Sequence, residues 1–225
     1  MPILLLSIVL LLVGLAISYQ LKRKLAEYGK ILIPSGYSGK EVAEKMLSDN
    51  GIHDVKIEIG QGMLTDHYNP QTKTVSLSPD VYNGRNVAAA AVAAHECGHA
   101  VQHQQAYAWL QMRSTLVPVV QYSGSVIQWI LLAGILLINT FPAIMLAGII
   151  LFGIITLFSL ITLPVEFDAS KRALVWIDKS QIMSTVDHAK AKDALNWAAL
   201  TYVVAAVSSI ATLLWYIMIY SNRRS

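Results

Sequence analysis

The 225-residue sequence contains few charged residues, and these are unevenly distributed. Only 14% of the residues are Asp, Glu, Lys or Arg, whereas a soluble domain has about 25%. No charge occurs in residues 1–21, 114–165 and 195–222, which form stretches of 21, 52 and 28 residues. One bilayer crossing needs about 20 apolar residues, so the stretches predict one, two and one crossings. The composition excludes an ordinary soluble domain, a disordered chain and a collagen.

The sequence also has little cysteine, lacks acceptor sites for N-glycosylation and carries a small net charge. Cys97 is the single cysteine, so no disulfide can form within the chain. The sequence has no Asn-x-Ser/Thr site. Its net charge of +3 is too small to indicate a nucleic-acid partner. The composition therefore identifies the lipid bilayer as the first partner of this chain.

The lengths of the apolar stretches set the number of membrane helices. The first stretch is followed, not preceded, by Lys22, Arg23 and Lys24, which favours a retained anchor over a cleaved signal peptide. As one helix, the 52-residue stretch would be about 78 Å long, against an apolar bilayer core of about 30 Å. The segment 139–142 contains Pro142 and predicts a reversal in the middle. The predicted crossings are residues 2–20, 117–138, 143–163 and 195–220.

Four crossings place the polar segments 21–115 and 164–194 on the same side of the membrane. Together these segments carry fifteen of the seventeen Lys and Arg residues. Basic residues near the ends of membrane helices favour the cytoplasmic side. We therefore expect both segments, and any site they form together, at the cytoplasmic face of the cell membrane.

Segment 21–115 has the pattern of a small α+β domain. Ser38 and Glu41 have the spacing of a capping box, which begins a helix. Alternating apolar and polar residues predict strands, and alanines favour a long final helix. The expected elements are a helix from residue 39 to about Asn50, strands at 55–59, 64–68 and 73–78, and a helix at about 86–113. Strand 73–78 is expected at an edge of the sheet, where it either pairs with a substrate or only covers the last helix.

That last helix carries the motif His-Glu-x-x-His at residues 95–99. Positions i and i+4 lie on one face of a helix, so His95 and His99 can bind one Zn²⁺. Glu96 lies beside them, where it can act as a general base on a metal-bound water. A structural helix that happens to carry histidines is the alternative interpretation. Cys97 points away from the two histidines and is expected to be a packing residue.

A catalytic zinc needs a third protein ligand, and Glu166 is the best candidate. It is the first charge after the 52-residue stretch, and the topology returns it to the side that holds His95 and His99. A carboxylate beside a bilayer is costly unless it is paired or metal-bound. The alternative is an ordinary ion pair of Glu166 with Lys171 or Arg172. His103 is about 12 Å from His95 along a straight helix, too far to share the metal, and is expected to be a polar neighbour or a solvated position.

These segments together resemble a known family. Residues 95–102, 163–174 and 198–203 are similar to the YugP-like family of bacterial membrane zinc metallopeptidases. The resemblance implies a predominantly α-helical multi-pass membrane protein with a small zincin-like catalytic domain, one catalytic Zn²⁺ and a polypeptide substrate. More distantly, residues 166–169 resemble the Glu-x-x-Ala-Asp signature of HtpX-type proteases, whose Glu is the third zinc ligand. Ser170 stands where those proteases have Asp, and Asp168 could support the histidines instead.

The sequence thus predicts a membrane zinc endopeptidase that acts on membrane-associated or misfolded polypeptides. Glu96 is the expected general base, and Arg172, His103 and His188 are candidate donors to the oxyanion. The rival hypothesis is an inactive zinc-binding scaffold or adaptor that binds another membrane protein. A transporter or channel is disfavoured because the predicted crossings contain no charge.

Overall fold

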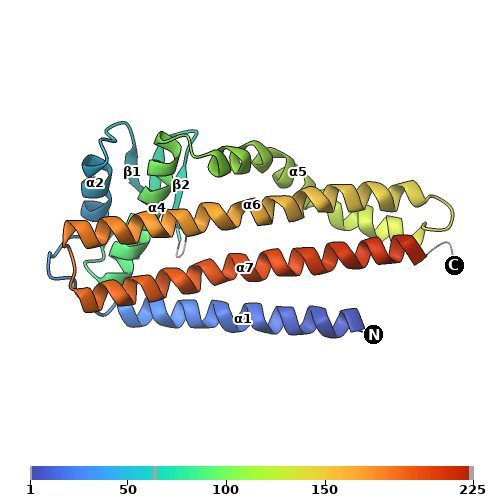
Figure 1. Cartoon of the computed structure of the whole chain (residues 1–225), viewed down its shortest axis with the longest axis horizontal. Helices are drawn as coiled ribbons and strands as arrows, with labels where there is room; N and C mark the ends of the chain where they lie inside the picture. The colour runs from blue at the N-terminus through green and yellow to red at the C-terminus, as the bar shows by residue number, and fades with distance from the viewer. Residues whose placement is uncertain (1, 63–64, 223–225) are drawn as a thin grey trace.

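The computed structural model describes residues 2–62 and 65–222, with side chains from residue 5 onward. It is predominantly helical, with a three-stranded sheet at one end (Figure 1). The elements in chain order are α1 (Pro2–Tyr28), α2 (Gly39–Asp49), β1 (Lys56–Ile59), β2 (His67–Asn69), β3 (Thr74–Leu77), α3 (Pro79–Asn83), α4 (Val87–Gln104), α5 (Ala108–Leu136), α6 (Pro142–Ser180) and α7 (Thr185–Asn222).

Four of these helices are long and apolar enough to span a membrane, as expected: α1, α5, α6 and α7. They expose large apolar side chains along their lengths, including Leu12, Trp129, Ile150 and Leu214, each 59–65% exposed. Such surfaces are unfavourable in water and suit a hydrocarbon solvent. α7 lies between α1 and α6, and α5 packs against the other side of α6 (Figure 1).

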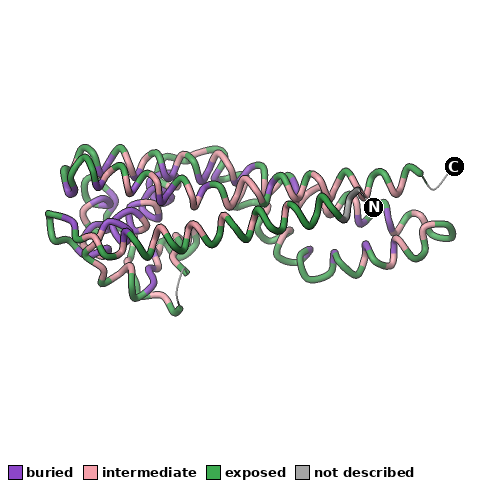
Figure 2. Tube along the Cα trace, turned by 90° about the horizontal axis from the view of Figure 1, so that it is seen from below, coloured by how far each residue is buried: buried purple, intermediate pink, exposed green. Residues whose placement is uncertain are grey.

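The packed core lies at the opposite end from the α5–α6 turn. Figure 2 shows buried residues concentrated where α2, α4 and the sheet meet the ends of the long helices. The core includes Val42 and Met46 of α2, Val75 and Leu77 of β3, and the alanine-rich face of α4. The small domain is therefore folded directly onto α6 and α7 and shares a core with them.

The start of α2 follows from its capping box. The backbone N–H of Glu41 donates to the Ser38 hydroxyl, and the backbone N–H of Ser38 donates to the Glu41 carboxylate. Val42 and Met46, one turn apart, are both buried, as the amphipathic pattern requires. Asn50 ends the helix, and Gly51 follows it with a φ of 70°, a conformation that favours glycine.

The sheet corrects one expectation. Its order is β1-β3-β2, with β1 parallel and β2 antiparallel to β3. The hairpin expected from residues 64–78 is present as β2 and β3, although residues 63–64 lie outside the described part of the chain. Strand 73–78 is central and not at an edge, because β1 pairs with the side of β3 that a simple hairpin would leave free. Residues 79–83, expected as a loop, form the short helix α3.

Two helix boundaries also differ from the sequence pattern. The helix expected over 86–113 is interrupted. α4 ends at Gln104, Ala106 turns the chain with a φ of 51°, and α5 begins at Ala108. Conversely, α6 runs unbroken through Pro164 to Ser180. The polar segment 164–194 is therefore the continuation of α6, a short turn and the start of α7. Because Glu166 lies within this continuous helix, its position on the helix determines which way its side chain points.

Candidate metal centre

The structure brings His95, His99 and Glu166 together as a group that could hold a metal ion. Their ligand atoms all lie within 4.8 Å of one another. The Nε2 atoms of His95 and His99 lie 3.2 and 3.6 Å from Oε2 of Glu166. Ligand atoms about 2.1 Å from a tetrahedral zinc are about 3.4 Å apart, so the donor set fits Zn²⁺. Among the described residues, no fourth His, Cys, Asp or Glu joins the group.

Close contact of α4 with α6 produces this arrangement. Gly98 lies between the two histidines, and a Cβ atom built on it would be only 2.6 Å from the carbonyl oxygen of Ala169. Ala169 is completely buried at this contact. The absence of a side chain at Gly98 therefore lets α4 approach α6 closely enough for both histidines to reach Glu166.

Each histidine is held by a second polar residue through its other ring nitrogen. Ser170 Oγ lies 3.1 Å from Nδ1 of His95, and Gln102 Oε1 lies 3.0 Å from Nδ1 of His99. The amide oxygen of Gln102 can only accept, so Nδ1 of His99 carries the proton and Nε2 is free to bind metal. Ser170, which departs from the HtpX-type pattern, thus still contacts a histidine.

Asp168 supports the site indirectly. Its carboxylate accepts from the Gln102 amide at 2.9 Å and from Arg172 Nε at 2.5 Å. Gln102 also donates to the carbonyl of Val165 at 2.8 Å and is completely buried. Asp168 is therefore connected to His99 through Gln102 and does not contact a histidine directly among the described residues. Sequence reasoning missed Gln102, although it lies on the same helical face as His95 and His99.

Arg113 is the most informative residue that sequence reasoning missed. Its guanidinium donates to Oε1 of Glu166 at 3.0 Å, while Oε2 faces the histidines. The alternative partners Lys171 and Arg172 make no ion pair with Glu166 among the described residues. A signal was present, because Arg113 and Glu166 are the two charges that flank the 52-residue stretch. The α5–α6 hairpin brings these two ends together.

Glu96 lies beside the group and lines a cavity of about 210 Å³ together with His95 and Glu166. Burial raises the pKa of Glu96 to about 7, partly offset by the nearby His95. A carboxyl group with a pKa near neutrality can both accept and release a proton. The other cavity-lining residues are Leu21 and Leu25 of α1, Asp66, Val92, Ser170, and Ala194, Leu195, Ala198, Ala199, Thr201 and Tyr202 of α7.

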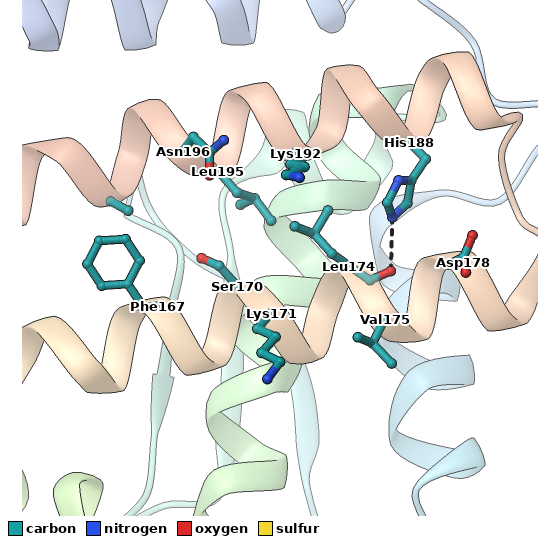
Figure 3. Close-up of a pocket in the computed structure, with 11 residues that line it drawn as sticks. Phe167, Ser170, Lys171, Leu174, Val175, Asp178, His188, Lys192, Leu195 and Asn196 are labelled. Atoms are coloured by element: carbon teal, nitrogen blue, oxygen red, sulfur yellow. Dashed lines mark hydrogen bonds between the residues drawn. The ribbon is translucent and has the colours of Figure 1, made fainter.

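The remaining candidates lie outside this cavity. His103 contacts the Tyr68 hydroxyl at 2.8 Å, and Arg172 pairs with Asp168. His188 donates to the carbonyl of Leu174 and lies in a separate groove between α6 and α7 (Figure 3). The structure therefore places none of the three expected oxyanion donors at the metal group. Cys97 is completely buried with its thiol directed at the Ala43 carbonyl, as expected for a packing residue.

Comparison with known proteins agrees with this geometry. A family profile described as "Putative neutral zinc metallopeptidase" matches residues 3–221. The chain is also 42% identical over 206 residues to a Bacillus subtilis (strain 168) protein named "Putative membrane protease YugP". That match covers 92% of this chain and 91% of the relative. No solved structure matches. The chain therefore belongs to this family of membrane zinc metallopeptidases.

Proposed function

We propose that the protein is an integral membrane zinc endopeptidase that cleaves membrane-associated or misfolded polypeptides at the cytoplasmic face. His95, His99 and Glu166 would hold the ion. When bound, zinc supplies a coordinated water with a pKa near 7 and polarises the substrate carbonyl. The observation that carries the proposal is the buried Glu96 beside a three-ligand group that opens into a cavity.

Glu96 carries out both proton transfers, and Arg113 positions a ligand. Glu96 takes a proton from the attacking water as the water oxygen bonds to the peptide carbon. Glu96 then passes that proton to the departing nitrogen as the C–N bond breaks. Arg113 keeps one Glu166 oxygen engaged so that the other stays directed at the histidines.

We further assign the donor to the oxyanion to Tyr202. The described hydroxyl groups in the cavity are those of Ser170, Thr201 and Tyr202. Ser170 is engaged with His95, and Thr201 donates to the carbonyl of Ala198 at 2.6 Å. Tyr202 lines the same cavity as His95, Glu96 and Glu166, and this shared lining supports the assignment. A hydroxyl there can donate a hydrogen bond to the negative oxygen of the transition state.

The inactive scaffold is the second candidate. A structural zinc site is normally closed by four protein ligands. The group found here has three among the described residues, which favours the enzyme. The test compares proteolysis and zinc content of the purified wild type with those of Glu96→Gln. We expect Glu96→Gln to retain zinc and to lose activity by about 10²–10⁴-fold. Stoichiometric zinc with no cleavage of any polypeptide by the wild type would instead support the scaffold.

The cytoplasmic orientation is testable separately. Ser48 is exposed on α2, and Thr140 is exposed in the turn between α5 and α6, at the opposite end of the molecule. Cysteines introduced at these positions can be labelled in intact cells with a membrane-impermeant maleimide, since the native Cys97 is buried. We expect labelling of Thr140→Cys and protection of Ser48→Cys. The reverse pattern would place the site outside the cell.

A further inference from the structure

We propose that the groove between α1 and α4 binds the part of the substrate next to the scissile bond, and that it selects an apolar side chain of a membrane-anchored polypeptide. This inference rests on the proposed peptidase function. It assigns α1 a role in substrate recognition in addition to membrane anchoring.

The groove is the space left between two helices that meet only near their ends. α1 packs along α7, and its last turns approach the start of α4 (Figure 1). The space between them has a volume of about 710 Å³. Ala26 of α1 and Gly29, just after that helix, line it on one side, and Ala88, Ala89 and Val92 line it from α4. These small side chains leave room for one larger apolar side chain.

The groove is continuous with the metal cavity. Leu25, Asp66 and Val92 line both spaces. Val92 lies three residues before His95 on α4, so it points to the same helical face about one turn away. A peptide whose carbonyl lies at the metal group can therefore extend directly into the groove.

The length and charge of the groove define the segment it can hold. Lys22 lines it from α1, and Lys30 lines it from two residues beyond the end of that helix at Tyr28. The helical part, residues 22–28, spans about 9 Å. An extended chain advances about 3.3 Å per residue, so about three substrate residues fit. Asp66 accepts hydrogen bonds from the backbone N–H and hydroxyl of Ser78, and Asp80 also lines the groove. The groove therefore carries two acidic and two basic side chains, so its net charge favours neither an acidic nor a basic substrate residue.

The position of the groove identifies a membrane-anchored substrate. Lys22 directly follows the predicted end of the first crossing, and Leu21 lines the metal cavity itself. A bond cleaved there lies within a few residues of the bilayer surface. A polypeptide that is itself anchored in the membrane presents such a segment without having to enter the headgroup region from solution.

The groove between α6 and α7 is the rival location. It has a volume of about 450 Å³ and also borders the metal cavity, sharing Ser170, Leu195 and Ala199 with it (Figure 3). However, Ser170 binds Nδ1 of His95, the ring nitrogen that faces away from Glu166. A peptide in that groove would approach His95 from its Nδ1 side, whereas one in the α1–α4 groove would approach along Val92, on the helix that carries Glu96.

One test uses variants that narrow or widen the groove and measures which side chain beside the scissile bond each variant prefers. Ala26 is exposed to the groove, so Ala26→Leu can fill it with little risk to folding. We expect Ala26→Leu to lower kcat/KM about 10-fold for membrane-anchored peptides with Leu or Phe beside the scissile bond, relative to the same peptides with Ala. Val92→Ala should shift the preference in the opposite direction. Ala108→Leu, an exposed position outside the groove, is the matched control. An unchanged preference in Ala26→Leu and Val92→Ala would overturn the inference.

A crosslinking experiment reads out binding without activity. Zinc-loaded Glu96→Gln in lipid nanodiscs is incubated with a membrane-anchored peptide that carries benzoylphenylalanine beside the scissile position. We expect crosslinks within residues 22–30 and 88–92, and their loss in the double variant with Ala26→Leu. Crosslinks within 167–175 instead would assign the substrate to the α6–α7 groove and overturn the inference. If the wild type cleaves nothing yet the crosslinks form at 22–30, the proposed function fails and the binding groove stands.

Discussion

The two ends of α6 bury different kinds of group. At the end with the sheet, α6 meets α4 so closely that Gly98 has no room for a Cβ atom, and Glu166 is buried beside the two histidines. At the other end, α6 also meets α5 closely at Gly134, but the buried side chains there are the apolar Ile127, Leu131 and Met145. Between these contacts, a Cβ atom on Gly153 would meet nothing within 4 Å. One helix thus contributes both a lipid-facing surface and a wall of the metal group. The candidate metal group is therefore built in part by a helix long and apolar enough to span a membrane.

The same contrast applies to polar side chains. Glu166 is 2% exposed and faces Arg113 and two histidines. In the apolar half of α6, the hydroxyl of the buried Thr156 contacts the Phe152 carbonyl and the Ser209 hydroxyl. Buried charge is stable only when it is paired or metal-bound. The buried charge of α6 is accordingly confined to its end at the sheet.

Two tyrosines on α7 should differ strongly in their effect on catalysis. Tyr202 lines the metal cavity, whereas Tyr216 packs against Phe152 in the apolar half. We expect Tyr202→Phe to lower kcat by about 10²–10³-fold, the typical cost of losing one oxyanion donor. KM and zinc content should change little. Tyr216→Phe should retain full activity, and equal losses in both variants would remove Tyr202 from the mechanism.

Replacement of two glycines, one at the contact of α4 with α6 and one in the open part of α6, should affect stability differently. Gly98→Ala should destabilise the protein by about 1–3 kcal/mol, because the new methyl group overlaps the Ala169 carbonyl. Gly153→Ala should be neutral or stabilising by up to about 1 kcal/mol, since alanine is the better helix former. Thermal unfolding in detergent measures both. A stable, zinc-loaded Gly98→Ala would show that α4 and α6 do not need this close contact.

Two Arg–Glu pairs test the role of burial. Arg113→Ala leaves Glu166 buried without its partner, so we expect the affinity for zinc to fall about 10–100-fold. Arg85 and Glu41 form a pair in which both side chains are largely exposed, and Arg85→Ala should leave zinc affinity unchanged. Competition with a chromophoric chelator gives both affinities. Equal affinities in the two variants would contradict the positioning role of Arg113.

The smallest effect should come from the polar partner of His95. Ser170→Ala removes the contact to Nδ1 of His95 while its backbone stays on α6. We expect about a 10-fold lower affinity for zinc, since such partners orient the ring without binding the metal. The control is Ser48→Ala on the exposed face of α2. An unchanged zinc affinity in Ser170→Ala would mean that packing alone orients His95.

The sequence was sufficient to predict the parts of the site that depend on local structure. Helix periodicity places His95 and His99 on one face, and the charge-free stretch returns Glu166 to them. Tyr202 and Gln102 could not be assigned roles because these depend on how α7 and α6 dock against α4. The break before α5 was missed because Ala106, with its positive φ, is neither glycine nor proline. The central place of β3 was missed because strand order is a tertiary property.

The most direct test of the account is X-ray absorption at the zinc edge, combined with zinc stoichiometry. We expect one zinc in the wild type, with two imidazole nitrogens and otherwise oxygen ligands, one of them exchangeable water. We also expect loss of stoichiometric zinc in Glu166→Ala and retention in Glu96→Gln. Full zinc occupancy in Glu166→Ala, or a fourth protein ligand that leaves no place for water, would contradict the proposed catalytic centre.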